Sequence, residues 1–527
     1  MLGPLVGDPP DYALSDDEVP WVLGTHLNAE SGPLARAPDG RRVLLVEAHD
    51  FARRKPFHHQ KLTLVFGAMR AFRDRLEAAG HDVSYIKADT FGEGLAAFFA
   101  RHPETTLVTM RPPSHGAETR LREVVDEAGG DLRVVENELF VSTRQAFDEW
   151  ADEDGDSFRH ENFYRWMRRE SGVLMDGGDP EGGAWNFDEQ NRAFPPDDWE
   201  APPKPPLESR DDVAAVHEWV GEEFDVWGES AFAPGDESEG FVWPVTREGA
   251  LARLEQFLDE RLPEFGPYQD AMLAEEWAMA HALLSPAINL GLLHPVEVIE
   301  ATEAAYGERD LPLNSVEGFI RQVLGWREFI RHVYRHTMPD LASASQLDVD
   351  RPLLEFYWNG DTDMNCLSET VDDVRARGYA HHIQRLMVLS NFATLWGVDP
   401  AELNDWFHAT YVDAYHWVTT PNVVEMGSYG AGVFATKPYV ASANYVDDMS
   451  DYCADCAYYK TKATGDDACP FNALYWDFLD RNEEPLRSNH RMSLMYSHVD
   501  DKRDSGEIDD IRARVAELRE MAADSEL

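Results

Sequence analysis

The chain has 527 residues, 43% of them hydrophobic, and a formal net charge of −51 at pH 7 from 98 acidic and 47 basic residues. Its length predicts two to four domains with sizeable cores. No apolar run is long enough for a transmembrane helix, and the N-terminus lacks a signal-peptide pattern. We therefore expect a cytoplasmic, monomeric protein without membrane contact.

The acidic excess argues against a uniformly basic surface for nucleic acid. Self-repulsion of this size is screened when molar salt shortens the Debye length to about 3 Å, so the charge predicts the protein of a halophile. The alternative is an acidic protein that avoids nucleic acid. Any interaction with DNA then needs a local basic surface.

Short apolar segments alternate with helical patterns in the first 150 residues. Between the second and third segments, apolar residues from Leu62 to Leu76 recur at helical spacing. This alternation predicts a doubly wound, Rossmann-like parallel sheet. The predicted strands are Trp21–Leu23, Val43–Glu47, Val83–Ile86, Leu107–Met110 and Leu132–Val135.

From about residue 213 onward the pattern is helical. We expect a disordered N-terminus over 1–18, an α/β domain over 19–150, a connection over 151–212, a large all-α domain over 213–500 and an acidic helical tail over 501–527. The proline-rich stretch 196–212 is the candidate linker.

Three arginines lie four residues apart in the helical pattern Val316–Met338, namely Arg327, Arg331 and Arg335. They share one helix face, opposite an apolar stripe. One interpretation is a solvated basic face, and the other is a local contact with the phosphates of DNA.

Three of the four cysteines fall in one short segment, as Cys453, Cys456 and Cys469, and the fourth is Cys366. A C-x-x-C pair with a third cysteine before proline is typical of iron–sulfur ligation, and four thiolates are what a [4Fe–4S] cluster needs. Zinc is the competing interpretation, although zinc ribbons usually carry two C-x-x-C pairs. Four unrelated buried cysteines are the remaining alternative.

A loop rich in glycine, serine and alanine precedes these cysteines. Its glycines, beginning with Gly427, allow close backbone approach, and Lys437 before Pro438 ends it with a cation. The combined pattern N-V-V-E-M-G, A-T-K-P-Y-x-x-S-x-N-Y and M-S-D-Y-C-x-x-C resembles the iron–sulfur bacterial cryptochromes and photolyases, including the prokaryotic (6-4) photolyases. That resemblance implies the cryptochrome/photolyase fold, with an antenna domain before a helical domain for FAD and [4Fe–4S].

In this family, further motifs imply the sites of the chromophores. The segment A-L-L-S-P-A-I-N-L-G resembles a flavin phosphate site at a helix start, and W-R-E-F resembles a flavin segment. The loop Gly430–Val433 is one residue shorter than the family pattern. The implied FAD contacts are Tyr268, Ser285, Asn289, Gln322, Trp326, Arg327, Arg385, Gly427 and Lys437.

The resemblance extends to the first domain, where relatives hold the antenna 6,7-dimethyl-8-ribityllumazine. The matching motifs are L-G-x-x-L, V-E and the helix that starts H-H-Q-K. A chromophore-free domain with polar loops is the alternative. The implied antenna residues are Gly24, Thr25, His26, Glu47 and Lys61.

The motif Y-A-H-H-I-Q-R-L-M-V places His381 and His382 side by side. Adjacent helical residues diverge, so we expect one of them to face a DNA lesion, and the resemblance selects His382 as proton donor. Both could instead be packing histidines. The resemblance also implies electron transfer through Trp358 and Trp406, with Phe407 where a relative has tyrosine.

The implied function is light-driven repair of pyrimidine (6-4) photoproducts in UV-damaged DNA by reduced FAD, with the lesion flipped out of the duplex. A blue-light photoreceptor with the same flavin is the nearest alternative, because the flavin motifs serve both. A non-photoactive iron–sulfur nucleic-acid binder is a third class, which explains the cysteines but not the L-L-S-P-A-I-N-L-G and H-H-I-Q-R-L-M-V segments.

Overall fold

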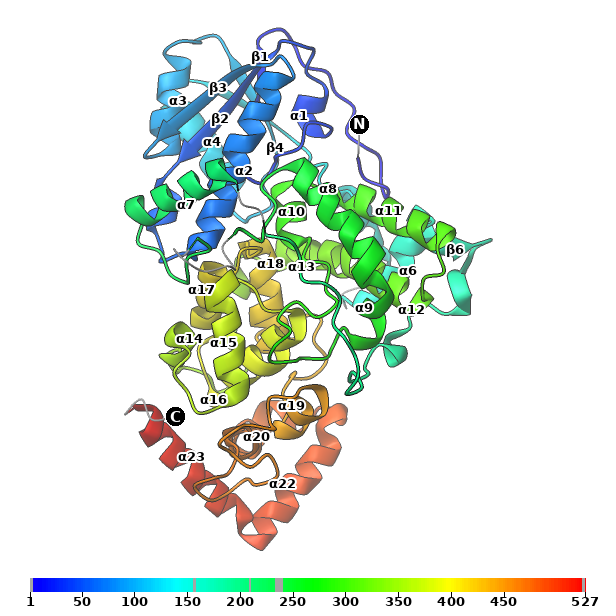
Figure 1. Ribbon diagram of the computed structural model, residues 1–527, viewed down its shortest axis with the longest axis vertical. Helices are drawn as coiled ribbons and strands as arrows, with labels where there is room; N and C mark the ends of the chain where they lie inside the picture. Colours follow the sequence, from blue (N-terminus) through cyan, green and yellow to red (C-terminus); the bar gives the residue numbers. More distant parts are fainter. Residues whose placement is uncertain (1–2, 155–157, 208–209, 233–239, 524–526) are drawn as a thin grey trace.

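The computed structural model describes residues 3–154, 158–207, 210–232, 240–523 and 527. It has an α/β domain at one end, a helical body in the middle and a group of C-terminal helices at the other end (Figure 1). Among the described helices, none is long and apolar enough to cross a membrane.

The sheet of the first domain is parallel throughout, with strand order β3-β2-β1-β4-β5. Helices α3 and α4 pack on one face through Phe98 and Val124, and α2 covers the other through Leu64 and Phe72. The doubly wound sheet predicted above is confirmed. Its elements are β1 (Glu18–Val22), α1 (Gly32–Ala35), β2 (Arg42–Ala48), η1 (Asp50–Arg53), α2 (His59–Ala78), β3 (Asp82–Ala88), α3 (Phe91–Phe99), β4 (Thr106–Met110), α4 (Ala117–Glu127) and β5 (Asp131–Val135).

The N-terminal segment is ordered where disorder was expected. The backbone amides of Leu5 and Val6 both donate to the carbonyl of Val141, and the Val6 side chain is buried in the main core. The Arg36 guanidinium lies 4.2 Å from the centre of the Tyr12 ring. The apolar residues between the prolines hold this segment against the domain; residues 1–2 lie outside the described range.

The connection between the domains packs along the helical body. Helix α6 contacts η5, and the loop after η3 leads toward α7. The connecting elements are α5 (Arg144–Asp154), α6 (His160–Ser171), β6 (Met175–Asp176), β7 (Asp179–Pro180), η2 (Glu181–Gly183) and η3 (Asp188–Gln190).

The rest of the described chain is helical, as predicted. Four segments, η4, η5, η7 and η8, are π-helical, a geometry that occurs often at functional sites. The elements up to the first cysteine loop are α7 (Asp211–Glu223), α8 (Arg247–Gln256), η4 (Phe257–Arg261), α9 (Leu262–Tyr268), α10 (Ser285–Leu290), α11 (Pro295–Glu308), α12 (Leu313–Ile320), η5 (Arg321–Arg327), α13 (Glu328–Thr337), η6 (Asp340–Ser343), α14 (Phe356–Asn359), α15 (Asn365–Arg377), η7 (Gln384–Ser390), α16 (Asn391–Trp396), α17 (Pro400–Thr410), α18 (His416–Thr420), η8 (Pro421–Gly427) and α19 (Ala443–Met449).

The C-terminal helices form part of this core and are not a separate tail. Ile508, Ile511, Val515 and Leu518 of α23 are buried, and α23 packs on α20. The expected boundary at residue 501 falls inside α22. These elements are α20 (Pro470–Arg481), α21 (Glu483–Leu486), η9 (His490–Met492), α22 (Ser493–Ser505) and α23 (Glu507–Ala523).

The arginine stripe joins the two domains, so both interpretations given above are wrong. Arg327 donates to the carbonyl of Leu139 at 3.2 Å, and Arg331 donates to that of Ser142 at 2.9 Å and stacks on a phenylalanine ring. Arg335 pairs with Asp148. Burial lowers the pKa of Arg327 and of Arg331 to about 10. An amphipathic pattern cannot distinguish a face that meets water from one that meets another domain.

We expect Arg331→Ala to lower the free energy of unfolding by about 3 kcal/mol, because it removes a buried guanidinium that binds across the domains. Arg335→Ala is the matched control on the same stripe. Arg335 pairs with the half-exposed Asp148, so its replacement should lower the free energy of unfolding by about 1 kcal/mol or less. Urea unfolding at constant molar KCl measures both, and equal losses would contradict a buried role for Arg331.

Candidate functional site

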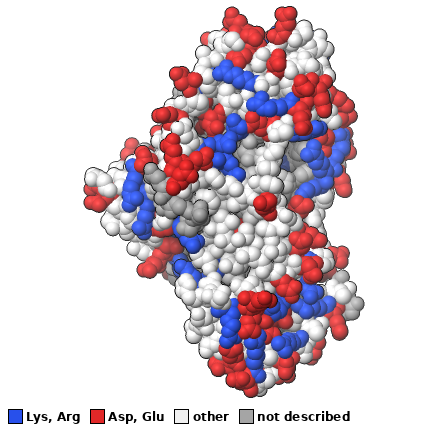
Figure 2. Space-filling model, turned by 180° about the vertical axis from the view of Figure 1, so that it is seen from behind, with Lys and Arg blue, Asp and Glu red and all other residues white. Residues whose placement is uncertain are grey.

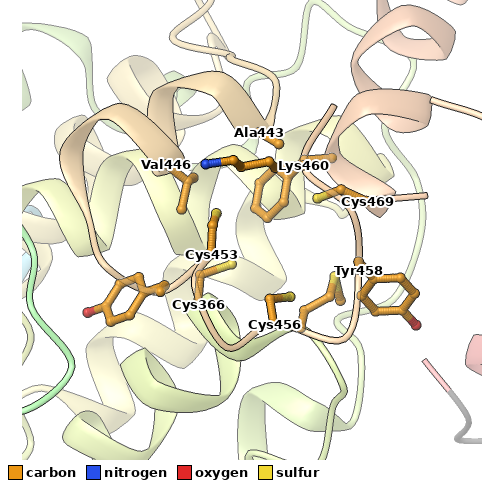
Figure 3. Close-up of a pocket in the computed structure, with 11 residues that line it drawn as sticks. Cys366, Ala443, Val446, Cys453, Cys456, Tyr458, Lys460 and Cys469 are labelled. Carbon is orange, nitrogen blue, oxygen red and sulfur yellow. The ribbon is translucent and has the colours of Figure 1, made fainter. Parts of the chain in front are cut away.

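The four cysteines line one cavity in the C-terminal half. Cys366 lies in the first turn of α15, Cys453 and Cys456 follow α19, and Cys469 precedes Pro470 at the start of α20. Figure 3 shows all four around the same space, together with Lys460. The structure therefore brings together side chains that are 103 positions apart in the sequence, from 366 to 469.

This cavity is lined mainly by apolar and aromatic side chains, and its empty volume is about 350 Å³, including some open to solvent. Burial raises the pKa of Cys453 to about 11 and of Cys469 to about 12, and it raises that of Cys366 further. Without a cation the thiols of Cys366, Cys453 and Cys469 are therefore protonated at neutral pH. A metal centre would supply the positive charge that favours thiolates here.

The second polar cluster consists of three histidines. The His281 ring is stacked on His381 with ring centres 4.7 Å apart, and its centre lies 5.4 Å from that of His382. His281 and His381 are buried, whereas the His382 side chain is 49% exposed and its Nε2 lies 3.2 Å from Asp270 Oδ1. Burial lowers the pKa of both buried histidines well below the usual value, so both are neutral.

The two adjacent histidines do not diverge as two residues within a helix would. His381 lies just before the helix that leads into η7, where its amide donates to Gln384 Oε1, and His382 lies in the first turn. Both rings therefore contact His281, which the sequence argument missed. The expected divergence of the two rings is therefore not seen, because both approach the same third ring. Exposure still separates them, because only His382 is open to a large ligand.

Three of the predicted flavin residues meet at one residue, Asp413. Arg385 donates to both its oxygens, at 3.0 and 3.1 Å, and Ser285 Oγ donates to it at 2.7 Å. Asn289 Nδ2 donates to the Asp413 carbonyl at 3.0 Å. The Tyr411 hydroxyl is buried and lacks a hydrogen-bond partner. Asp413 was missed, although an isolated acid within the aromatic segment T-Y-V-D-A-Y was a usable signal.

We expect Asp413→Ala to destabilise the fold by about 3–5 kcal/mol and to reduce flavin content, because the Arg385 guanidinium loses its counter-charge. Asp405→Ala is the control, since Asp405 forms an exposed pair with Lys55 and should cost less than about 1 kcal/mol. Urea unfolding and the ratio of flavin to protein absorbance measure the two effects. Equal behaviour of both variants would contradict the role of Asp413.

The other predicted flavin residues do not join this cluster. Trp326 is stacked on His160 at 3.8 Å, Gln322 donates to the Gly318 carbonyl, and the Tyr268 ring packs on Trp199. Arg327 lies at the domain contact described above. Gly427 faces Ser390, where an added Cβ would lie 3.0 Å from the serine Cβ, and Lys437 is exposed.

The shortened loop is held by Glu425, a buried residue that the sequence argument did not use. Its carboxylate accepts from the backbone amides of Ala431, Phe434 and Ala435 at 2.9 to 3.1 Å. Three amides on one carboxylate fix the path of the loop.

The predicted electron-transfer tryptophans occupy one aromatic region. Trp406 is buried, its indole donates to the Tyr357 carbonyl at 3.0 Å, and its ring centre lies 5.3 Å from that of Tyr357. Trp358 contacts Trp227 at 5.9 Å, and Trp227 donates to the Trp358 carbonyl. Phe407 is stacked on Tyr411 at 5.0 Å.

A smaller cavity lies in the α/β domain where β1 and β4 end. Its lining includes His26, Asn28 and Met110. The order of strands changes direction between β1 and β4, which is where open α/β sheets bind ligands. Burial lowers the pKa of His26 to about 3, so the ring is neutral. Gly24 and Thr25 belong to the same β1 loop.

Two predicted antenna residues are already engaged by protein groups. Glu47 is buried and accepts from Arg70 at 2.8 and 3.0 Å, and it also bonds Tyr85. Lys61 is buried and donates to the carbonyls of His408 and Ala414 in the helical domain. The ammonium group of Lys61, which the resemblance assigned to the antenna site, thus joins the two domains in this structure.

Comparisons with known proteins agree with this arrangement. A family model described as deoxyribodipyrimidine photo-lyase-related protein matches residues 20–232. The chain is 40% identical over 491 residues to a (6-4) photolyase of Agrobacterium fabrum. The matched residues cover 90% of this chain and 94% of that relative.

Two solved structures share the fold. A bacterial class III photolyase from Agrobacterium tumefaciens matches with a TM-score of 0.55 and 18% identity, over 81% of this chain and 82% of that one. A Synechocystis cryptochrome matches with a TM-score of 0.53 and 14% identity, over 80% and 83%. At these identities the two structures support the fold alone, which is the predicted cryptochrome/photolyase fold.

Proposed function

The chain belongs to the family of bacterial (6-4) photolyases and related cryptochromes, and we propose that it is a DNA photolyase that uses light to reverse pyrimidine (6-4) photoproducts. The observation that carries this proposal is the 40% identity to a (6-4) photolyase along nearly the whole of both chains. The half-exposed His382 beside two buried neutral histidines is consistent with it, because (6-4) repair needs a proton donor that a flipped base can reach.

FAD is the proposed catalytic cofactor. The polar groups around Asp413 fit a flavin nucleotide, since Ser285, Asn289 and Arg385 supply a hydroxyl, an amide and a guanidinium beside the unpartnered Tyr411 hydroxyl. When bound and reduced, FAD supplies the electron that light drives into the lesion. Trp406 and Trp358 are the proposed electron donors that return an oxidised flavin to its reduced form.

The spread of the cysteine sulfurs supports a [4Fe–4S] cluster more than zinc. Among the described residues, no three cysteine sulfurs lie within 4.8 Å of one another. The group of side chains that meets this spacing is His281, His381 and His382. A single zinc ion with Zn–S bonds of about 2.3 Å would draw its sulfurs to within about 4 Å. Four cysteines around one mainly apolar cavity instead suit a multi-iron cluster.

We assign the lumazine antenna to the cavity at the ends of β1 and β4. His26, Gly24 and Thr25 are the residues that support this placement, since they line or follow that edge of the sheet. Glu47 lies at the end of neighbouring β2 and could contribute only if its bonds to Arg70 and Tyr85 rearranged.

UV-damaged DNA is the proposed partner despite the acidic charge. On the face shown in Figure 2, acidic and basic side chains are interspersed at both ends, with a largely uncharged band between them. This face is not a basic surface for DNA. Because the formal net charge of the chain is −51, we expect binding that depends on the extruded lesion more than on phosphate contacts.

The test is light-dependent restoration of an oligonucleotide that carries one (6-4) photoproduct, with a dark control, in molar KCl. Restored oligonucleotide in the illuminated sample supports the proposal. Flavin absorbance without any restoration would favour the photoreceptor alternative. A protein without flavin bands would contradict both and favour the iron–sulfur binder, against which the identity to a photolyase already argues.

A further inference from the structure

The histidine cluster has the geometry of a metal site. One ring nitrogen from each of His281, His381 and His382 lies within 4.8 Å of the other two, and among the described residues this is the group of histidine, cysteine and acidic side chains that meets this spacing. His281 Nε2 and both ring nitrogens of His381 are buried and lack hydrogen-bond partners. Buried polar atoms are normally paired, so three unpaired nitrogens at one point call for an explanation.

We propose that these three histidines bind one divalent transition metal ion of the zinc class, and that the bound ion inhibits the enzyme. The ion fits because imidazole is a preferred ligand of zinc, copper and nickel, with metal–nitrogen bonds of about 2.0–2.1 Å. Three nitrogens around such an ion lie about 3.4 Å apart in tetrahedral geometry. The rings therefore need to move inward by about 1 Å, and the fourth position is left for water.

Coordination also accounts for the surroundings of the cluster. Neutral imidazole is the form that binds a metal, and burial already keeps His281 and His381 neutral. The carboxylate of Asp270, 3.2 Å from His382 Nε2, is the type of outer partner that orients a ligating histidine. Binding changes no oxidation state.

Inhibition rests on the proposed function. If His382 donates a proton to the lesion, a metal on one of its nitrogens removes the donor and places an ion beside the half-exposed ring that the lesion would meet. Magnesium should not act in this way, because it prefers oxygen ligands in octahedral geometry.

The binding test is equilibrium dialysis of the flavin-loaded protein against zinc in molar KCl and millimolar magnesium, with metal analysis of zinc and iron. Magnesium and salt occupy the many carboxylates of a chain with net charge −51. We expect one zinc per chain with iron content unchanged. Zinc bound only with loss of iron would place it at the cysteines and overturn the proposal.

Variants locate the ion. His281→Ala, His381→Ala and His382→Ala should each weaken zinc binding by at least about tenfold, and Asp270→Asn by about tenfold. The exposed His498 lies outside the cluster, so His498→Ala is the control and should bind as the unmodified chain does. If a buried variant fails to fold, His382→Ala, on a half-exposed residue, still decides the question. Unchanged affinity in His382→Ala would refute the site.

The kinetic test separates this site from the proposed function. Zinc should slow light-driven repair by the unmodified chain and a chelator should restore it, while any repair that His281→Ala retains should be insensitive to the same zinc concentration. Zinc binding to the three histidines in a protein without repair activity would preserve the site and refute the proposed function. Repair unaffected by saturating zinc would refute the inhibition.

Discussion

His382→Ala should reduce repair of (6-4) photoproducts by about 10²–10⁴-fold while flavin content stays near normal. His382 is half exposed and its Nε2 contacts Asp270, so truncating it removes an accessible proton donor without leaving a large buried void. Repair under single-turnover illumination measures the loss, and flavin absorbance measures the retained cofactor. Molar KCl in the assay keeps loss of fold from being mistaken for loss of chemistry.

His381→Ala is the adjacent comparison. His381 is buried against His281, so its removal should mainly lower stability and should affect repair less than the loss of His382. Full repair by His382→Ala, or an equal loss in both variants with release of flavin, would remove His382 from the proton-transfer step.

Local patterns predicted the elements of this fold because hydrophobic periodicity reports burial directly. The parallel strands read as short apolar runs, and α2 and α23 read as helical stripes, in agreement with the structure. The same logic failed for the arginine stripe from Arg327 to Arg335, and the resemblance did not anticipate the contacts of Lys61 with the helical domain. In each case a cationic side chain donates hydrogen bonds to carbonyl or carboxylate groups of the other domain. A local sequence pattern does not show which segment packs against a helix.

The candidate sites divide in the same way. The four predicted cysteines came together as expected, Cys366 from a separate segment included, while the polar partners of the other sites did not emerge from the sequence. Asp413, Glu425 and His281 each hold or extend a site, and each is one polar residue in an otherwise apolar segment. Such residues become visible when tertiary contacts show what they bind.

Cys366→Ser should reduce bound iron from about four atoms per chain to near zero, and it should sharply reduce the yield of folded protein. Cys366 is buried in the core cluster formed by α15 and the C-terminal helices, so a lost ligand removes the link between α15 and the loop after α19. Serine keeps the size of the side chain but is a poor ligand for iron. Iron analysis and the charge-transfer absorption of the cluster measure the loss.

The chain has no fifth cysteine to serve as control, so the matched change is Ala443→Ser in the wall of the same cavity. It adds a hydroxyl at a buried position without removing a thiol, and it should retain iron. Cys456→Ser tests a more accessible ligand, and it should lose iron with a smaller loss of folded yield. Stoichiometric zinc in place of iron in the unmodified protein, or full iron content in both cysteine variants, would contradict the cluster. The first of these outcomes would also mean that the sulfurs move closer together around a single ion, since zinc–sulfur bonds are about 2.3 Å long.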